Sequence, residues 1–389
     1  MKTALWFRRL PWSVVAIALG LIVCGWLAVA RAEAFREDLV GGSSRYVGQQ
    51  VVFSLLALAA MFAVARLDYQ ALCRLSYPLF VAAVGLLVAV FFFPPINNAR
   101  RWIRIGAIGL QPAEFAKLAY VLALARYLMH RDNYRRLRGL MAPLAVTLLP
   151  VALILKEPDL GMAMVFWPLL FIMLWIAGAR RRDLAVALVA GLAALPLLWT
   201  QMSREQRSRV TALFDQPAAD QRPSDEAYHL HQAKRMLALG GVWGSLVAGP
   251  LSDDPADYQL PEARNDFIFC VVGERFGLWG LGMVLSLYGL LAWRGAAIAA
   301  AAREPFGRLA AAGVTAMIAV QTLINVGMNL GLLPITGLSL PLVSYGGSGL
   351  LAHGAALGLL LSVGSHLAYE VGPEPFRFRD GPSMGRLKH

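Results

Sequence analysis

Long apolar runs, separated by short polar segments, recur from near the start of the chain almost to its end. A helix needs about 20 mostly apolar residues to cross a bilayer, so the pattern predicts about ten membrane-spanning helices. The predicted spans are residues 11–30, 47–66, 76–94, 111–129, 142–156, 160–178, 183–200, 266–293, 308–331 and 343–368. For the first span, a signal peptide ending near Ala28-Val29-Ala30 is an alternative. We therefore expect an all-α, polytopic integral membrane protein in which residues 1–389 form a single transmembrane domain.

Four polar segments interrupt this pattern: residues 94–111, 156–161, 201–265 and 331–349. The long segment 201–265 lies between the seventh and eighth predicted spans. Within it, residues 226–239 are predicted to form an amphipathic helix that Gly240 and Gly241 end. With the predicted order of spans all four segments face the same side of the membrane, so we expect the chemistry there.

The charge distribution orients the chain. Hydrophobic residues make up 58% of the sequence and charged residues 15%, which is too apolar for the core of one soluble domain to enclose. The net charge of +12 could indicate a nucleic-acid binder, but about 20 Lys and Arg fall in one set of short segments and about seven in the other. By the positive-inside rule both termini are cytoplasmic and the four polar segments are external. Three cysteines, Cys24, Cys73 and Cys270, lie in or beside spans and are interpreted as packing residues.

Ionisable residues near the spans are candidates for function, because such groups are costly in a membrane. Glu114 and Lys117 lie three residues apart on one helical face, either as a structural ion pair or as ligands of an anionic substrate. Asp159 begins the sixth span, where it could cap the helix or take part in catalysis.

Asp266 is the strongest candidate for catalysis, because it lies where the long external loop enters the membrane. Desolvation there would raise the carboxyl pKa and favour a general base that works near neutral pH. A helix N-cap is the alternative. Nearby in sequence, Glu262, Arg264 and Glu274 could tune Asp266 or hold the loop.

Arg100, Arg101 and Arg104 place positive charge in a short external segment, against the usual distribution. Guanidinium groups bind phosphate oxygens bidentately, so a pyrophosphate headgroup would explain them. Solvated loop charge is the alternative. Trp102 could stack on a sugar or anchor the segment in the interface. His229 and His231 have no further pair to complete a metal site, and no P-loop, zinc signature or Ser-His-Asp motif is present.

An ordered set of motifs resembles the SEDS family, the RodA, FtsW and SpoVE proteins, over nearly the whole chain. The motifs are NARRWI (98–103), QPAEFAK (111–117), EPDLG (157–161), LPEARNDFIF (260–269), NVGM (325–328), GLLPITG (331–337) and LPLVSYGGS (340–348).

The resemblance implies a peptidoglycan glycosyltransferase of the bacterial cytoplasmic membrane that polymerises lipid II, the undecaprenyl-diphosphate-linked disaccharide-pentapeptide. It also implies a class B penicillin-binding protein as transpeptidase partner, for cell elongation or division. Asp266 matches the family's essential acidic residue. Cavity or motif positions match Arg101, Trp102, Glu114, Lys117, Asp159, Ser344, Gly346 and Gly347. A divalent cation, Mg²⁺ or Mn²⁺, could assist, with ligands that the sequence does not identify.

One motif departs from the family pattern. The usual Gly-Gly-x-x-Gly-x-Gly run ends here in Gly244-Ser245-Leu246 instead of a final glycine. This departure keeps a non-catalytic scaffold open as an alternative, and a lipid II flippase would use the same basic cavity. Neither alternative needs a general base.

Overall fold

The structure is a computed structural model that describes residues 7, 9–40, 45–95, 99–105, 108–130, 137–193, 196, 199–200, 202–214, 225–250, 252, 258 and 260–366. The long helices are α2 (Trp12–Val40), α3 (Arg45–Arg66), α4 (Tyr69–Ala89), α5 (Pro112–His130), α6 (Met141–Lys156), α7 (Leu160–Ala177), α8 (Arg181–Ala193), α13 (Ile268–Ala301), α14 (Pro305–Asn329) and α15 (Gly347–Ser365). Shorter elements are the 3-10 helices η1 (Val90–Phe92) and η3 (Leu137–Leu140), the strands β1 (Ile103–Ile105) and β2 (Ile108–Leu110), and the helices α10 (Arg204–Thr211), α11 (Asp225–Gly240) and α12 (Ser245–Ala248).

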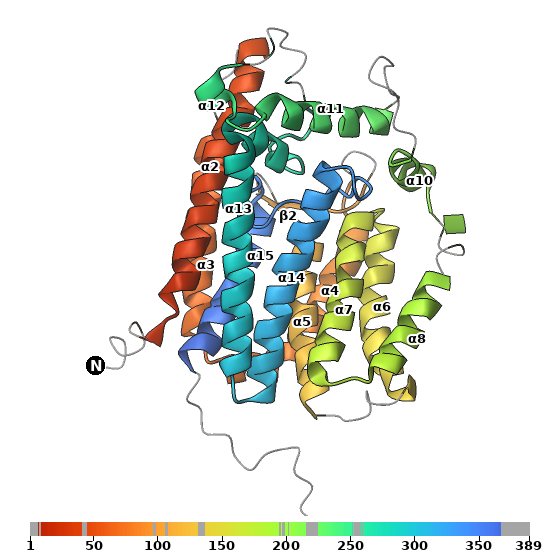
Figure 1. Ribbon diagram of the computed structural model, residues 1–389. Helices are drawn as coiled ribbons and strands as arrows, with labels where there is room; N and C mark the ends of the chain where they lie inside the picture. Colours follow the sequence, from red (N-terminus) through yellow and green to blue (C-terminus); the bar gives the residue numbers. More distant parts are fainter. Residues whose placement is uncertain are drawn as a thin grey trace, which may run out of the picture.

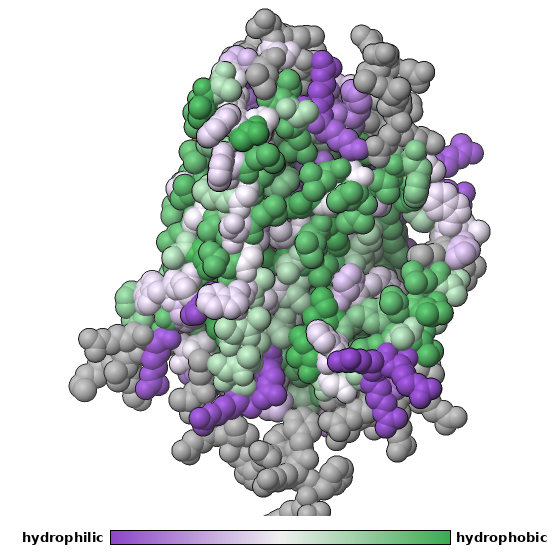
Figure 2. Space-filling view, viewed as in Figure 1, coloured by the Kyte–Doolittle hydropathy of each residue, from purple (hydrophilic) through white to green (hydrophobic). Residues whose placement is uncertain are grey.

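The long helices run side by side as one bundle, and α11 lies across one end of it (Figure 1). Among the described residues, seven helices are long and apolar enough to cross a membrane. Apolar side chains cover most of the visible bundle surface, and hydrophilic ones gather toward its two ends (Figure 2). An all-α polytopic membrane protein is therefore confirmed, with at least seven membrane-length helices.

Each of the ten predicted spans coincides with a helix, although several boundaries move. The third begins earlier than predicted, at Tyr69 rather than residue 76, because Asp68 caps it by accepting a hydrogen bond from the Gln70 backbone N–H at 2.9 Å. The eighth runs on to Ala301 and is broken at Gly277, whose φ of 63° is outside the helical range. A two-stranded hairpin, in which Ile103 pairs with Leu110, adds a small element that the all-α prediction did not contain.

The predicted amphipathic helix of the long loop is confirmed as α11. It packs against α13 at Gly240, where a Cβ atom would lie 2.0 Å from the carbonyl oxygen of Gly273. Only glycine allows this approach. In the motif that departs from the family pattern, a Cβ atom on Gly244 would lie 2.4 Å from the carbonyl oxygen of Arg275, whereas Leu246 is 53% exposed. The missing glycine thus falls at a position that the surrounding structure does not crowd.

The last polar segment, between α14 and α15, folds back into the bundle. A Cβ atom on Gly161 of α7 would lie 2.2 Å from the carbonyl oxygen of Thr336, and one on Gly25 of α2 would lie 2.5 Å from that of Val343. Ile335, Leu338, Leu340 and Val343 are all buried. The packing of this segment against two helices builds one wall of the site described next.

Candidate active site

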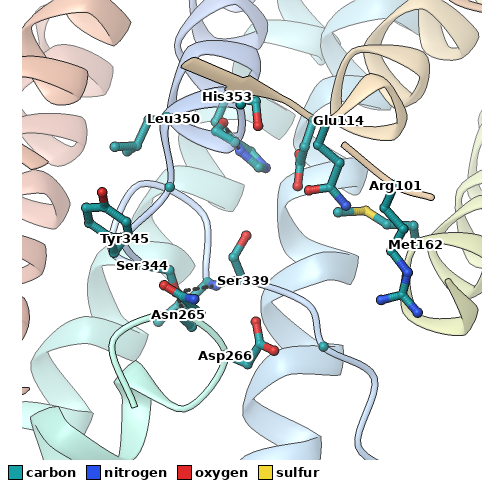
Figure 3. Close-up of a pocket in the computed structure, with 18 of the residues that line it drawn as sticks. Arg101, Glu114, Met162, Asn265, Asp266, Ser339, Ser344, Tyr345, Leu350 and His353 are labelled. Atoms are coloured by element: carbon teal, nitrogen blue, oxygen red, sulfur yellow. Dashed lines mark hydrogen bonds between the residues drawn. The ribbon is translucent and has the colours of Figure 1, made fainter. Parts of the chain in front are cut away.

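A cavity of about 560 Å³ lies where the polar segments meet, and Figure 3 shows residues that line it. Its lining includes residues from all four of them, which confirms that they come together. The predicted site residues that line it are Arg101, Trp102, Arg104, Glu114, Asp159, Asp266, Ser344, Gly346 and Gly347. Arg100, Lys117 and Glu262 do not line it.

Asp266 is held in place through its backbone. Its carbonyl oxygen accepts hydrogen bonds from the side-chain amides of Asn325 at 2.8 Å and Asn329 at 3.2 Å, both on α14. The carbonyl of the preceding Asn265 accepts one from Ser344 Oγ at 2.5 Å. Helix α13 begins after Phe267 without a side-chain cap, so the N-cap alternative for Asp266 is wrong. The carboxylate therefore has no role in capping and faces the cavity.

The surroundings of Asp266 raise its pKa to about 7. Burial is the largest cause, followed by the negative charges of Glu262 and Asp159, while Arg209 and Arg101 act in the opposite direction. A carboxyl group with this pKa exchanges a proton readily near neutral pH. The desolvation expected from the sequence is thus present.

Asp159 caps α7 by accepting a hydrogen bond from the Met162 backbone N–H at 3.1 Å, as one sequence alternative predicted. Its second oxygen faces Gln111 Nε2 at 3.3 Å and Arg101 Nε at 4.0 Å. Burial nevertheless raises its pKa. Asp159 therefore combines a structural role with a place in the cavity wall.

The three arginines of the first polar segment differ in their contacts and in their position relative to the cavity. Arg101 donates to the backbone carbonyls of Glu157 and Pro158, so part of its guanidinium holds the neighbouring segment. Arg104 is exposed and lines the cavity. Arg100 bonds the Phe91 carbonyl at 2.7 Å outside the cavity, so its proposed contact with substrate is not supported.

Glu114 and Lys117 form a buried ion pair of 3.0 Å, and Lys117 also donates to Gln321 Oε1 at 2.5 Å. The structural interpretation of Lys117 is thus the better one, because its ammonium is buried behind the cavity wall rather than in it. Glu114 reaches the cavity, so the pair supports one of its walls.

Residues near Asp266 in sequence hold the loop. Arg264 lies over the Tyr46 ring at 3.9 Å, and Glu262 accepts a hydrogen bond from Asn265 Nδ2 at 2.5 Å. Glu274 forms an ion pair of 2.9 Å with Arg31 of α2. Of the three, Glu262 is the one whose charge acts on the Asp266 pKa.

Gly346 and Gly347 of the last motif suit their positions for different reasons. A Cβ atom on Gly347 would lie 3.0 Å from the Phe53 ring, so this position needs a small residue. Gly346 has open space around its Cα and borders the cavity. Side-chain bulk at Gly346 would therefore fill the cavity itself.

Several lining residues were not predicted. Arg209 comes from α10 in the long loop, and His353 from the second turn of α15. A polar residue inside an apolar run was the available signal for His353. Arg209 gave none, because it is one of several arginines in a polar stretch.

Comparison with known proteins identifies the family. The sequence pattern of a family described as "Cell cycle protein" (FtsW, RodA and SpoVE) matches residues 11–369. The peptidoglycan glycosyltransferase MrdB of Escherichia coli strain K12 is 34% identical over 369 residues, which cover 94% of this chain and 96% of the relative. Stage V sporulation protein E of Bacillus subtilis is 32% identical over 365 residues, covering 92% and 97%.

Solved structures agree. The rod shape determining protein RodA of Thermus thermophilus is similar with a TM-score of 0.68 and 30% identity, covering 93% of this chain and 98% of that one. A chain from work on the structural coordination of polymerization and crosslinking by a peptidoglycan synthase complex gives a TM-score of 0.76 and 31% identity, covering 93% and 99%.

Fold and site together define a multi-pass bacterial membrane protein with a polar cavity at one end of its helix bundle. The chain belongs to the FtsW/RodA/SpoVE family. The resemblance stated from the motifs is therefore confirmed, as is the predicted enzyme class, peptidoglycan glycosyltransferase.

Proposed function

We propose that this chain polymerises lipid II into glycan strands at the outer face of the cytoplasmic membrane, with Asp266 as general base. Asp266 takes the proton of the acceptor sugar's 4-hydroxyl, and the oxygen attacks the anomeric carbon of a lipid-linked donor. The bond between that carbon and the diphosphate oxygen breaks, and undecaprenyl diphosphate leaves. One glycosidic bond therefore forms for each bond that breaks between an anomeric carbon and a diphosphate oxygen.

One observation carries the proposal: the Asp266 carboxyl shares a cavity with the guanidinium groups of Arg101, Arg104 and Arg209. A carboxyl with a pKa near 7 suits proton removal from a hydroxyl. Arginines stabilise the charge that develops on a diphosphate leaving group. A base and an anion site on one cavity are what glycosyl transfer from a diphosphate needs.

We further propose ten membrane crossings, in which α5, α6 and α8 join the seven helices that are long and apolar enough to cross a membrane. They lie alongside the others in the bundle (Figure 1). The positive-inside count then puts both termini in the cytoplasm and the cavity outside. Lipid-linked precursor would enter from the outer leaflet.

A class B penicillin-binding protein is the proposed partner, supported by the similarity to a chain of a peptidoglycan synthase complex. Relatives named FtsW and MrdB are equally similar, so elongation and division both stay open. Of the residues that the structure describes, no three His, Cys, Asp or Glu side chains are grouped to bind a metal ion. A Mg²⁺ or Mn²⁺ ion on the diphosphate therefore stays a proposal without protein ligands assigned to it.

The test is polymerisation of lipid II by purified protein with its penicillin-binding partner. We expect glycan polymer from the wild type and a loss of rate of about a hundredfold or more for Asp266→Asn, which keeps the shape and removes the base. Asp183→Asn on α8, where a carboxyl lies away from the cavity, is the matched control and should polymerise normally.

The same assay separates the alternatives. A flippase would move lipid II across vesicle membranes without forming polymer. A scaffold would assemble with its partner and give no polymer. Wild-type rate in Asp266→Asn would contradict the assignment of the base.

A further inference from the structure

The inner end of the cavity carries three buried polar side chains that the proposed chemistry does not use. His353 is 1% exposed, Ser348 3% and Glu114 2%, and all three line the cavity. We call this group the cavity floor. Figure 3 shows the His353 ring and the Glu114 side chain facing each other, with Asp266 at the far end.

The hydrogen bonding of His353 fixes which of its atoms is available. Its Nδ1 lies 2.7 Å from the carbonyl oxygen of Gly349, one turn earlier in α15. A carbonyl oxygen can only accept, so Nδ1 carries the proton, and Nε2 of the neutral ring presents a lone pair. Within the described part of the chain, Nε2 is buried without a hydrogen-bond partner.

Ser348 Oγ is buried and unpartnered among the described residues in the same way. A buried polar atom without a partner destabilises the folded state, because its lost hydrogen bonds to water are not replaced. Two such atoms on one cavity therefore indicate a ligand that supplies the missing hydrogen bonds.

The charges of the floor restrict the chemistry of that ligand. The Glu114 carboxylate is 3.0 Å from Lys117 Nζ, so the pair is neutral as a whole. Toward the cavity the floor presents a carboxylate and a lone pair, both of which repel an anion. Arg101, just before β1, and Arg104, in β1, attract an anion and line the cavity elsewhere, and Figure 3 shows the Arg101 guanidinium well away from the His353 ring.

We propose that the cavity floor is a subsite for an uncharged hydrogen-bond donor of the substrate headgroup, a hydroxyl or an amide N–H, with His353 Nε2 as its acceptor. The diphosphate of the same substrate lies toward the arginines. This inference rests on the proposed function for the identity of the substrate and adds which end of the headgroup enters the cavity.

The experiment measures affinity for two probes in nanodiscs: lipid II, and undecaprenyl diphosphate, which has the lipid and the diphosphate but no sugar or peptide. His353→Phe removes the acceptor and keeps an aromatic ring. We expect it to weaken lipid II binding by about tenfold, the cost of one buried unpaired donor, and to leave undecaprenyl diphosphate binding unchanged. His353→Gln, which can place an amide oxygen near the Nε2 position, should recover most of the affinity.

His366→Phe is the matched control, since His366 follows the end of α15 and does not line the cavity. It should change neither affinity. Should His353→Phe fail to fold, Ser348→Ala tests the floor in its place, with a loss expected for lipid II alone.

Equal losses for both probes, no loss for either, or a Gln variant as weak as the Phe variant would overturn the subsite. Because binding needs no turnover, the outcome is independent of the polymerisation test. If His353→Phe weakened lipid II binding alone while the wild type formed no polymer, only the proposed function would be contradicted.

Discussion

The side-chain amide of Asn325 donates one hydrogen bond of 2.8 Å to the backbone carbonyl of Asp266 and another of 2.6 Å to that of Leu338. Asn325 is fully buried on α14. One side chain thus ties the candidate base to the last polar segment, where a Cβ atom on Gly337 would lie 3.5 Å from the Asp266 carboxylate. Asn325 is therefore a positioning residue for the proposed reaction.

Replacing Asn325 with Ala should lower both stability and rate. The buried Leu338 carbonyl loses its hydrogen bond from Asn325, which costs about 1–3 kcal/mol when no replacement is found, and the Asp266 carbonyl keeps only the longer bond from Asn329. A displaced base should slow polymerisation at saturating lipid II by about tenfold or more, because reaction depends steeply on alignment. Thr315→Val on the same helix, where the hydroxyl bonds only the local Ala311 carbonyl among the contacts described, is the control. An unchanged rate in Asn325→Ala would remove its positioning role.

The helices were predictable because their apolar runs are long and end in recognisable signals. Asp159, for example, was placed correctly as a candidate cap by its position after Pro158. The hairpin was not predicted, because three-residue strands are too short to show a period of two. The sequence also left Glu114 and Lys117 ambiguous, since the partner that decides the matter, Gln321, is distant in sequence.

The site was predicted in part, for a physical reason. Residues in polar segments that end at a span, such as Asp266, must come near the membrane surface. Side chains such as His353 depend on the rotation of a helix about its axis, which an apolar run on all sides does not specify. Arg100 and Arg104 are four residues apart and could not be distinguished from the sequence. In the structure Arg104, in the hairpin, lines the cavity and Arg100 does not.

Arg104 and Arg100 make a matched pair for the anion site. Arg104→Gln should weaken lipid II affinity by about tenfold, the order of one lost charge-assisted hydrogen bond, and the loss should shrink at high salt. Arg100→Gln removes the same charge outside the cavity and should have little effect. Equal losses would mean that the segment attracts the headgroup only by its overall charge.

Arg101 should behave differently from Arg104, because it also holds the backbone of Glu157 and Pro158. Arg101→Gln is expected to lower the melting temperature as well as the affinity, and Arg101→Lys to recover only part of either, since the bidentate fork is lost. A melting temperature equal to the wild type would show that those carbonyl contacts contribute nothing to stability.

Glu157 gives a stability test that depends on pH. Glu157 is buried at the end of α6. Burial, and secondly the negative charge of Asp159, raise the pKa of its carboxyl to about 8, while the positive charge of Arg101 acts in the opposite direction. The stabilisation from holding its proton is full below the ordinary pKa of about 4.5 and is lost as pH rises to about 8. The melting temperature of Glu157→Gln minus that of the wild type should therefore grow from pH 5 to pH 8 and stay constant above. A difference that does not change with pH would contradict this protonation.

The pH dependence of polymerisation tests the role of Asp266 most directly. A general base must be ionised, and the pKa of Asp266 is about 7, so kcat/KM should rise with pH through about 7 and level off above it. Glu262→Gln removes a negative charge that raises this pKa and should move the rise to lower pH. A profile that is flat from pH 5 to pH 8 in the wild type, or one that Glu262→Gln leaves in place, would contradict Asp266 as the base.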